Sequence, residues 1–335
     1  SSLPSALRLS LMLRLEESRR AKGTRAVAAG GQDSIAARLA ATEQRCHTKC
    51  SSSGAPCTPR AWSQNRVVVR NAMAIIALMT DFGTRDHYVA AMKGMILQID
   101  PKATLVDITH EIEPQEIVSG AFILRQAFPY FPVGTIFLAV VDPTVGTSRR
   151  ILAARYSDRI VLAPDNGLLT LIHRDAEVQE VRVVDNRRLM AASLSSTFHG
   201  RDIFAPVAGH LSKGMSLGQV GPAASQVLML ELAKPVYRPN GGLDGEVLFI
   251  DRFGNLITNI SELDLSAAHS RARQHRVAVG PHEVGPIQFS YADVPQGKLI
   301  ALIGSTQMLE IAVNGGSAAA ALDARRGTPI QVRAE

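Results

Sequence analysis

Residues 134–154 read GTIFLAVVDPTVGTSRRILAA. An apolar run ends abruptly at Asp142-Pro143, and a second apolar run begins at Ile151 after two arginines. The pattern predicts a buried strand, a tight loop and a second strand, with Asp142 and Arg149 at the two ends of the loop. Open α/β sheets place ligand chemistry at the C-terminal tips of buried strands. The pair is equally consistent with a structural ion pair that closes the loop, so the surrounding segments have to distinguish the two interpretations.

Short apolar runs alternate with segments of helical spacing on both sides of this loop. Strands are expected at 75–79, 104–108, 159–163 and 181–184, and helices after Tyr88, Ile117 and Phe204. Strand–helix–strand alternation predicts an α/β layer with a largely parallel sheet over residues 73–234.

The pattern changes after about residue 225. A linker rich in proline and glycine begins near Pro235, and short strands separated by turn residues follow it. They are expected at 245–250, 256–260, 276–279, 298–303, 309–313 and 329–332. Short, evenly spaced strands predict a small antiparallel barrel or sandwich over residues 235–335.

The formal net charge of +6 belongs to the beginning of the chain. Residues 1–72 contain 12 basic and four acidic residues, whereas residues 73–335 contain 24 basic and 26 acidic residues. The main body is therefore nearly neutral, which does not favour nucleic-acid binding. No apolar run reaches the length of about 18 residues that a membrane span needs.

Residues 1–72 also hold all three cysteines, Cys46, Cys50 and Cys57. Their spacing matches no common zinc pattern, so a disordered segment is favoured over a metal site. We expect this stretch to be a basic leader, either an organellar transit peptide or an over-extended reading frame with Met73 as the true start. The first interpretation predicts an organelle and the second predicts the cytoplasm.

Two more residues at strand ends are candidates for chemistry. Asp81 follows the first strand and suits a ribose diol, although it could equally cap the next helix. His199 lies in a polar loop beside Gly200, where it could face a ligand or simply satisfy a backbone carbonyl. The histidines show no ligand spacing, so no metal is expected.

Six segments in order resemble one known family. They are TDFGT at 80–84, VDPTVGTSRR at 141–150, APDNG at 163–167, TFHGRDIFAP at 197–206, DRFGNLITN at 251–259 and GSTQMLEIAVNGGSA at 304–318. Together they closely resemble the S-adenosylmethionine (SAM) hydrolases, also called SAM hydroxide adenosyltransferases, which are related to fluorinase and chlorinase. The resemblance covers residues 73–335 and implies an N-terminal α/β domain followed by a C-terminal β-barrel domain.

The resemblance also implies an activity and a catalytic set. It implies hydrolysis of SAM to adenosine and L-methionine, with Asp142, Arg149 and His199 activating the water that attacks C5′ of the ribose. In the halogenases the aspartate position is a tyrosine and the His-Gly pair is replaced, so Asp142 and His199-Gly200 point to hydrolysis. Thr144 stands where the family usually has glycine, and would tilt the loop if that position requires a positive φ.

Binding roles follow from the same resemblance. Asp81 would fix the ribose. The remaining roles fall on the C-terminal half, where Phe253 and Asn255 would contact the adenine. Asp251 and Ser305 would hold the amino and carboxylate ends of the methionine, and Glu310 is a further candidate for its ammonium. SAM is then the substrate, with no cofactor and no metal. The family also implies a homotrimer, in which the N-terminal domain of one subunit meets the barrel of its neighbour.

Three alternatives remain to be tested. A halide-using transferase of the same superfamily would make 5′-halo-5′-deoxyadenosine, but the carboxylate of Asp142 would repel a halide. A non-catalytic SAM or adenosine binder would keep the pocket without turnover. A nucleic-acid-associated protein would have to rely on the basic leader.

Overall fold

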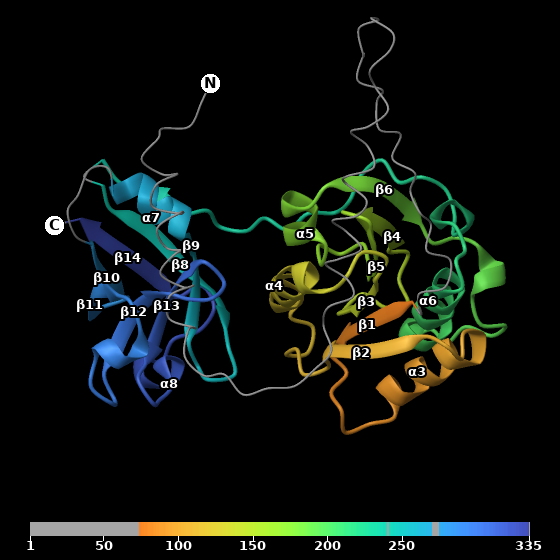
Figure 1. Ribbon diagram of the computed structural model, residues 1–335, viewed down its shortest axis with the longest axis horizontal. Coiled ribbons are helices and arrows are strands. Elements are labelled where there is room, and N and C mark those ends of the chain that lie inside the picture. The colour runs from red at the N-terminus through yellow and green to blue at the C-terminus, as the bar shows by residue number, and fades with distance from the viewer. Residues whose placement is uncertain (1–73, 240, 270–274, 335) are drawn as a thin grey trace, which may run out of the picture. The chain divides into compact units, whose positions relative to one another are not determined.

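Figure 1 shows the computed structural model, which describes residues 74–239, 241–269 and 275–334. The predictions for the basic leader, for a zinc site at its cysteines and for a start at Met73 lie outside the described residues. The two structured regions are called here the sheet region, residues 74–234, and the barrel region, residues 235–334.

The sheet region is built on a mixed sheet with strand order β2-β1-β3-β5-β4-β6. The strands are β1 (Ile75–Thr80), β2 (Thr104–Thr109), β3 (Ile136–Val140), β4 (Ile151–Tyr156), β5 (Arg159–Pro164) and β6 (Val178–Val183). The first four strands in this order run parallel, and β4 runs antiparallel to both of its neighbours. The prediction of an α/β fold with a largely parallel sheet is confirmed.

Helices cover both faces of this sheet, which explains why β1 and β3 are apolar without alternation. Ile76 and Leu78 face one core with Met92 and Phe204, whereas Ala77 and Met79 face another core. The helices are α3 (Tyr88–Ile99), α4 (Ile117–Ala127), α5 (Thr170–Asp175) and α6 (Ala205–Ser212), with short helical turns η1 (Phe128–Tyr130), η2 (Arg187–Leu189) and η4 (Leu217–Gln219).

The sequence pattern missed one feature of this region. The segment η3 (Gly200–Phe204), which immediately precedes α6, is a π-helix. Hydrophobic periodicity does not reveal one extra residue in a turn, although such turns are frequent at functional sites.

The barrel region closes on itself. Of the described residues, eight strands form its sheet in the order β14-β10-β11-β12-β13-β9-β8-β7, and pairing of β14 with β8 closes a ring of seven. The strands are β7 (Val236–Tyr237), β8 (Leu243–Ile250), β9 (Leu256–Ser261), β10 (His275–Val279), β11 (His282–Gln288), β12 (Leu299–Ile303), β13 (Met308–Val313) and β14 (Pro329–Ala334). The region also contains α7 (Glu262–His269), η5 (Tyr291–Asp293) and α8 (Ala318–Leu322).

The closed ring supports the barrel over the sandwich. Three details differ from the prediction. The short strand β7 lies in the stretch that was predicted as a linker. Strand β11 was not expected, because Gly285 and Pro286 interrupt its apolar pattern. It also pairs parallel with β12, whereas the other pairs in the barrel are antiparallel.

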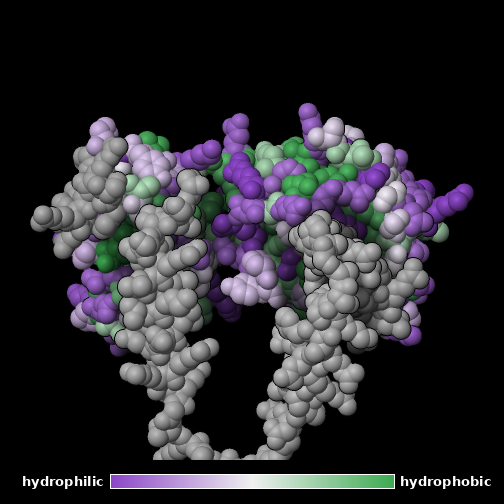
Figure 2. All heavy atoms as spheres, turned by 45° about the horizontal axis from the view of Figure 1, so that its top comes forward, coloured by the Kyte–Doolittle hydropathy of each residue, from purple (hydrophilic) through white to green (hydrophobic). Residues whose placement is uncertain are grey.

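Most apolar side chains lie inside these two regions, but a few large ones remain exposed on the barrel. Phe289 is 95% exposed and Phe253 is 76% exposed. On the face drawn in Figure 2, hydrophobic residues lie in patches among hydrophilic ones. Within the described part of the chain, no helix combines the length and the apolar character that crossing a bilayer requires.

Candidate active site

The loops that follow β1 and β3 meet the segment before η3 at one edge of the sheet, as expected for the carboxyl ends of parallel strands. They enclose a cavity of about 270 Å³. Its lining consists of Asp81, Phe82, Pro114, Gln115, Val140, Asp142, Pro143, Val145, Thr197, Phe198, His199 and Gly200. Three residues predicted from separate segments, Asp81, Asp142 and His199, therefore share one cavity.

Asp142 and Arg149 form a buried ion pair, with side-chain exposures of 4% and 8%. Arg149 donates from Nε at 2.8 Å and from Nη2 to the same oxygen, Oδ2 of Asp142. The other oxygen, Oδ1, accepts the hydroxyl of Thr144 at 3.1 Å. One lone pair of Oδ1 remains for a water molecule, because a carboxylate oxygen accepts two hydrogen bonds.

His199 joins this pair through Arg149. Its Nδ1 lies 2.9 Å from Nη2 of Arg149. A guanidinium can only donate, so Nδ1 is the acceptor and the ring proton is on Nε2. Burial, followed by the charge of Arg149, lowers the pKa of His199 despite the opposing effect of Asp142 and Asp202. The imidazole is therefore neutral at pH 7, and Nε2–H is a hydrogen-bond donor. His199 does not serve a backbone carbonyl through Nδ1.

Asp81 is held by a strained neighbour. Its Oδ2 accepts the backbone N–H of Gln115 at 2.8 Å, and Gln115 has a φ of 67°. A non-glycine residue in this conformation is uncommon and is often found at binding sites. Burial raises the pKa of Asp81, and its hydrogen bond to Gln115 only partly opposes this. The alternative that Asp81 caps the next helix is wrong, because the N-cap residue of α3 is His87 and no side chain caps that helix end.

The loop from Asp142 to Arg149 is shaped by Gly146. Gly146 has a φ of 83°, and a Cβ placed on it would lie 2.5 Å from the carbonyl oxygen of Ser196. Only glycine allows this approach between the two loops. Thr144 is not among the described residues with positive φ, so its backbone does not meet the condition under which a tilt of the loop was expected. Its hydroxyl contributes the hydrogen bond to Asp142 instead.

The predicted residues of the barrel lie at a second place. Asp251 accepts the backbone N–H groups of Phe253 and Asn255 through Oδ1 and the amide of Asn255 through Oδ2, at 2.8 to 2.9 Å. Phe253, Asn255 and Tyr291 line a cavity of about 480 Å³. The cavity that contains Asp142 has no barrel residue in its lining. The structure therefore places Asp142 at one cavity and the barrel residues Phe253 and Asn255 at another.

Glu310 is only 6% exposed and accepts the phenol of Tyr291. Burial raises the pKa of the Glu310 carboxyl, with a further contribution from the charge of Asp251. Burial and the hydrogen bond to Glu310 raise the pKa of Tyr291. Tyr291, like Gln115 and Phe198 in the sheet region, was not predicted from the sequence, since nothing in its spacing marks it.

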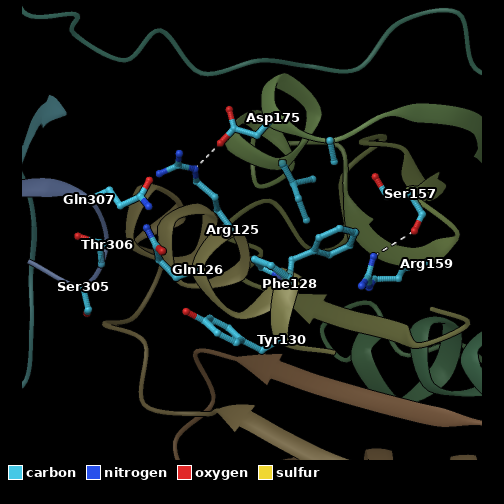
Figure 3. Close-up of a pocket in the computed structure, with 13 residues that line it drawn as sticks. Arg125, Gln126, Phe128, Tyr130, Ser157, Arg159, Asp175, Ser305, Thr306 and Gln307 are labelled. Atoms are coloured by element: carbon cyan, nitrogen blue, oxygen red, sulfur yellow. Dashed lines mark hydrogen bonds and ion pairs between the residues drawn. The ribbon is translucent and has the colours of Figure 1, made fainter. Parts of the chain in front are cut away.

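Ser305 lies at a third cavity, of about 470 Å³ (Figure 3). There it shares the lining with Thr306, Gln307 and, from α4, Arg125 and Gln126. Arg125 donates to Asp175 across this cavity. The structure does not bring Ser305 into the same cavity as Asn255, and its role at the methionine stays a prediction.

Metal ligands form no group in the described part of the chain. No cluster of three or more His, Cys, Asp or Glu side chains in the described ranges could hold an ion.

Comparison with known proteins agrees with this architecture. The model of the SAM hydroxide adenosyltransferase N-terminal domain matches residues 76–221, and that of the C-terminal domain matches residues 245–331. The chain is 39% identical to the (R)-S-adenosyl-L-methionine hydrolase of Salinispora tropica, covering 77% of this chain and 97% of that protein. It is 37% identical to the hydrolase of the same name from Thermus thermophilus, covering 78% of this chain and all of that protein.

A fluorinase and a solved structure are also similar. The fluorinase of Nocardia brasiliensis is 30% identical, with 77% of this chain and 96% of that protein covered. The crystal structure of an uncharacterized conserved protein from Thermotoga maritima matches with a TM-score of 0.72 at 39% identity, over 77% of this chain and 99% of that one. Both domain models match in order and together span most of the described chain, so the chain belongs to the SAM hydroxide adenosyltransferase family.

Proposed function

We propose that this chain hydrolyses SAM to adenosine and L-methionine, and that Asp142, Arg149 and His199 activate the water. The observation that carries the proposal is that Asp81, Asp142 and His199 line one cavity, while Arg149 is hydrogen-bonded to both Asp142 and His199. The curated hydrolases that the chain resembles over nearly their whole length support the same activity. SAM is the substrate, and the proposal needs no cofactor.

The chemistry requires a nucleophile rather than a better leaving group. The sulfonium of SAM already makes methionine a good leaving group, whereas bulk water has a pKa of about 15.7. The oxygen of a water molecule forms a bond to C5′ as the C5′–S bond breaks, and the electron pair of that bond neutralises the sulfur. The water proton passes to Oδ1 of Asp142 and then to solvent, which leaves a neutral 5′-hydroxyl on adenosine.

Each neighbour has a distinct task in this step. The two donors of Arg149 hold Oδ2 of Asp142, so that Oδ1 faces the water. The Nε2–H of His199 donates to the water oxygen and fixes its direction of attack. Asp81, acceptor-only when ionised, binds the ribose hydroxyls and keeps C5′ in line with the water.

We infer that the barrel supplies the rest of the pocket from a neighbouring subunit of a homotrimer. In this proposal the chain divides at about Pro235 into an α/β domain, residues 73–234, and a barrel domain, residues 235–335, preceded by the leader. Phe253 and Asn255 bind the adenine, while Asp251, Ser305 and Glu310 bind the methionine part. The exposed Phe253 ring supports this assignment, as does the absence of Phe253 and Asn255 from the lining of the cavity that contains Asp142. A cytoplasmic location stays a prediction.

Incubating the purified full chain with SAM tests the activity directly. Because the relatives are named for the R configuration, the assay should use the separated R and S sulfonium epimers. We expect adenosine and methionine in equal amounts, with faster turnover of the R epimer, measured by chromatography with and without chloride. Formation of 5′-chloro-5′-deoxyadenosine would favour the halide transferase, and tight SAM binding without products would favour the binder.

Mixing two inactive variants tests the shared site. If the residues act across an interface, subunits carrying Asp142→Ala and subunits carrying Asp251→Ala regain activity when unfolded and refolded together. In a ring of heterologous interfaces, random mixing at equal amounts restores about a quarter of the wild-type activity. The control is each variant refolded alone. A mixture as inactive as its components would contradict the shared site while leaving the hydrolase activity of the wild type untouched.

A further inference from the structure

Asp202 is a buried carboxylate close to the candidate site, but it does not line the cavity. It is 2% exposed and lies three residues after His199, inside η3. A buried charge has to be paired and hydrogen-bonded, or it destabilises the fold. The groups that pair with Asp202 therefore indicate what it holds in place.

Its partners lie on both sides of His199 in the chain. The backbone N–H of Ser195 donates to Oδ2 at 2.7 Å, and Arg201 donates from Nε to Oδ1 at 2.6 Å and from Nη2 to Oδ2 at 3.1 Å. The backbone of Asp202 accepts from Ala191 at 2.8 Å. Burial alone would raise the pKa of Asp202, but the hydrogen bonds from Arg201 and Ser195 outweigh it, and the pKa lies below its ordinary value.

The segment 195–198 is in direct contact with the loop that carries Asp142. The carbonyl oxygen of Ser196 approaches Gly146 so closely that no side chain fits there. Phe198, 8% exposed, packs edge-on against Phe82 at 5.9 Å between ring centroids. The guanidinium of Arg201 lies 5.0 Å from the centre of the Phe198 ring. Asp202 thus anchors a segment whose position determines where His199 meets Arg149.

Asp202 also acts on His199 through its charge. The charged groups that act on His199 are Arg149 and Asp142 from the loop after β3 and Asp202 from its own segment. Arg149 lowers the pKa of His199, whereas Asp142 and Asp202 raise it. Asp202 therefore opposes part of the effect of Arg149 without touching the water or the substrate.

We propose that Asp202 is a positioning residue for the hydrolysis, which fixes the segment 195–198 so that Nδ1 of His199 meets Nη2 of Arg149 and Nε2–H points at the water. The proposal rests on the proposed function of His199. The carboxylate acts only through the backbone and through His199, and its removal should affect turnover rather than SAM binding.

Asp202→Asn tests this role, since it keeps the shape and removes the charge. We expect kcat to fall by about 10- to 100-fold, the size of effect that a small misplacement of a catalytic group produces. The dissociation constant for SAM, measured by calorimetry, should stay near the wild-type value. In a plot of kcat against pH, the acidic limb should move to lower pH. The variant loses the negative charge of Asp202, which raises the pKa of His199.

Asp165→Asn is the matched control. Asp165 is 9% exposed, accepts Nε of Arg150 at 2.8 Å and accepts the backbone N–H of Leu228 at 2.8 Å, so it has the same kind of partners away from His199. We expect a similar loss of melting temperature with little change in kcat or in the pH profile. Equal losses of kcat in both variants with an unmoved acidic limb would assign Asp202 a purely structural role and overturn the proposal.

Two more variants keep the result decisive. Arg201→Gln removes two donors but leaves the carboxylate, and its side chain is 39% exposed, so the variant should fold even if Asp202→Asn does not. Arg201→Gln should lower kcat without moving the acidic limb of the pH profile to lower pH. A wild-type kcat in this variant would overturn the proposal. His199→Ala distinguishes a failure of the proposed function from a failure of the inference about Asp202. Full activity of His199→Ala would refute the role of His199 itself. If His199→Ala is inactive and Asp202→Asn has the wild-type kcat, only the positioning role of Asp202 is refuted.

Discussion

Replacing Asp142 by asparagine should lower kcat by about 100- to 10,000-fold, the range that a positioned general base contributes. Asparagine keeps the size of the side chain, and its amide oxygen can still accept from Arg149. It loses the negative charge and the basic oxygen that takes the proton from water. The ribose and the adenine are bound elsewhere in the proposed site, so the affinity for SAM should change little.

The measurement combines single-turnover product formation with calorimetric titration of SAM. The melting temperature of Asp142→Asn should be compared with that of Asp165→Asn, because each variant replaces a buried, arginine-paired carboxylate by a neutral amide. Asp165→Asn should retain turnover. If Asp142→Asn hydrolysed SAM at the wild-type rate, the water would have to be activated by another group, and the assignment of Asp142 would be abandoned.

The sequence predicted the convergence of Asp81, Asp142 and His199, because strand ends of a parallel sheet meet at one edge. It also predicted the pairing of Asp142 with Arg149 as an ion pair that closes a loop, and the structure shows that this ion pair also lines the cavity through Asp142. The two interpretations were therefore not exclusive.

Other features of the site depend on contacts that spacing along the chain does not encode. The bond from Arg149 to His199 joins residues 50 positions apart, and the close approach of Gly146 to Ser196 sets its geometry. The positive φ of the loop after β3 lies at Gly146, two residues after Thr144. The π-helix at Gly200–Phe204 and the parallel strand β11 have no periodicity that distinguishes them from their surroundings.

Replacing Arg149 by methionine should have the second-largest effect, with kcat reduced by about 100-fold or more. Methionine has a similar length but cannot donate, so Oδ2 of Asp142 loses two hydrogen bonds and Nδ1 of His199 loses its partner. The carboxylate then has no fixed orientation toward the water. Because the pair is almost fully buried, removal of one partner should also lower the free energy of unfolding by about 3 kcal/mol.

Arg149→Lys distinguishes geometry from charge. Lysine keeps the positive charge, but its single ammonium cannot present the paired Nε and Nη2 donors that hold Oδ2 of Asp142. We expect its stability, from urea unfolding, to lie between those of wild type and Arg149→Met, while its kcat stays close to that of Arg149→Met. A lysine variant with wild-type kcat would show that charge alone suffices. The proposed alignment of the water by the Asp142–Arg149–His199 contacts would then be wrong, because those contacts require the fork of a guanidinium.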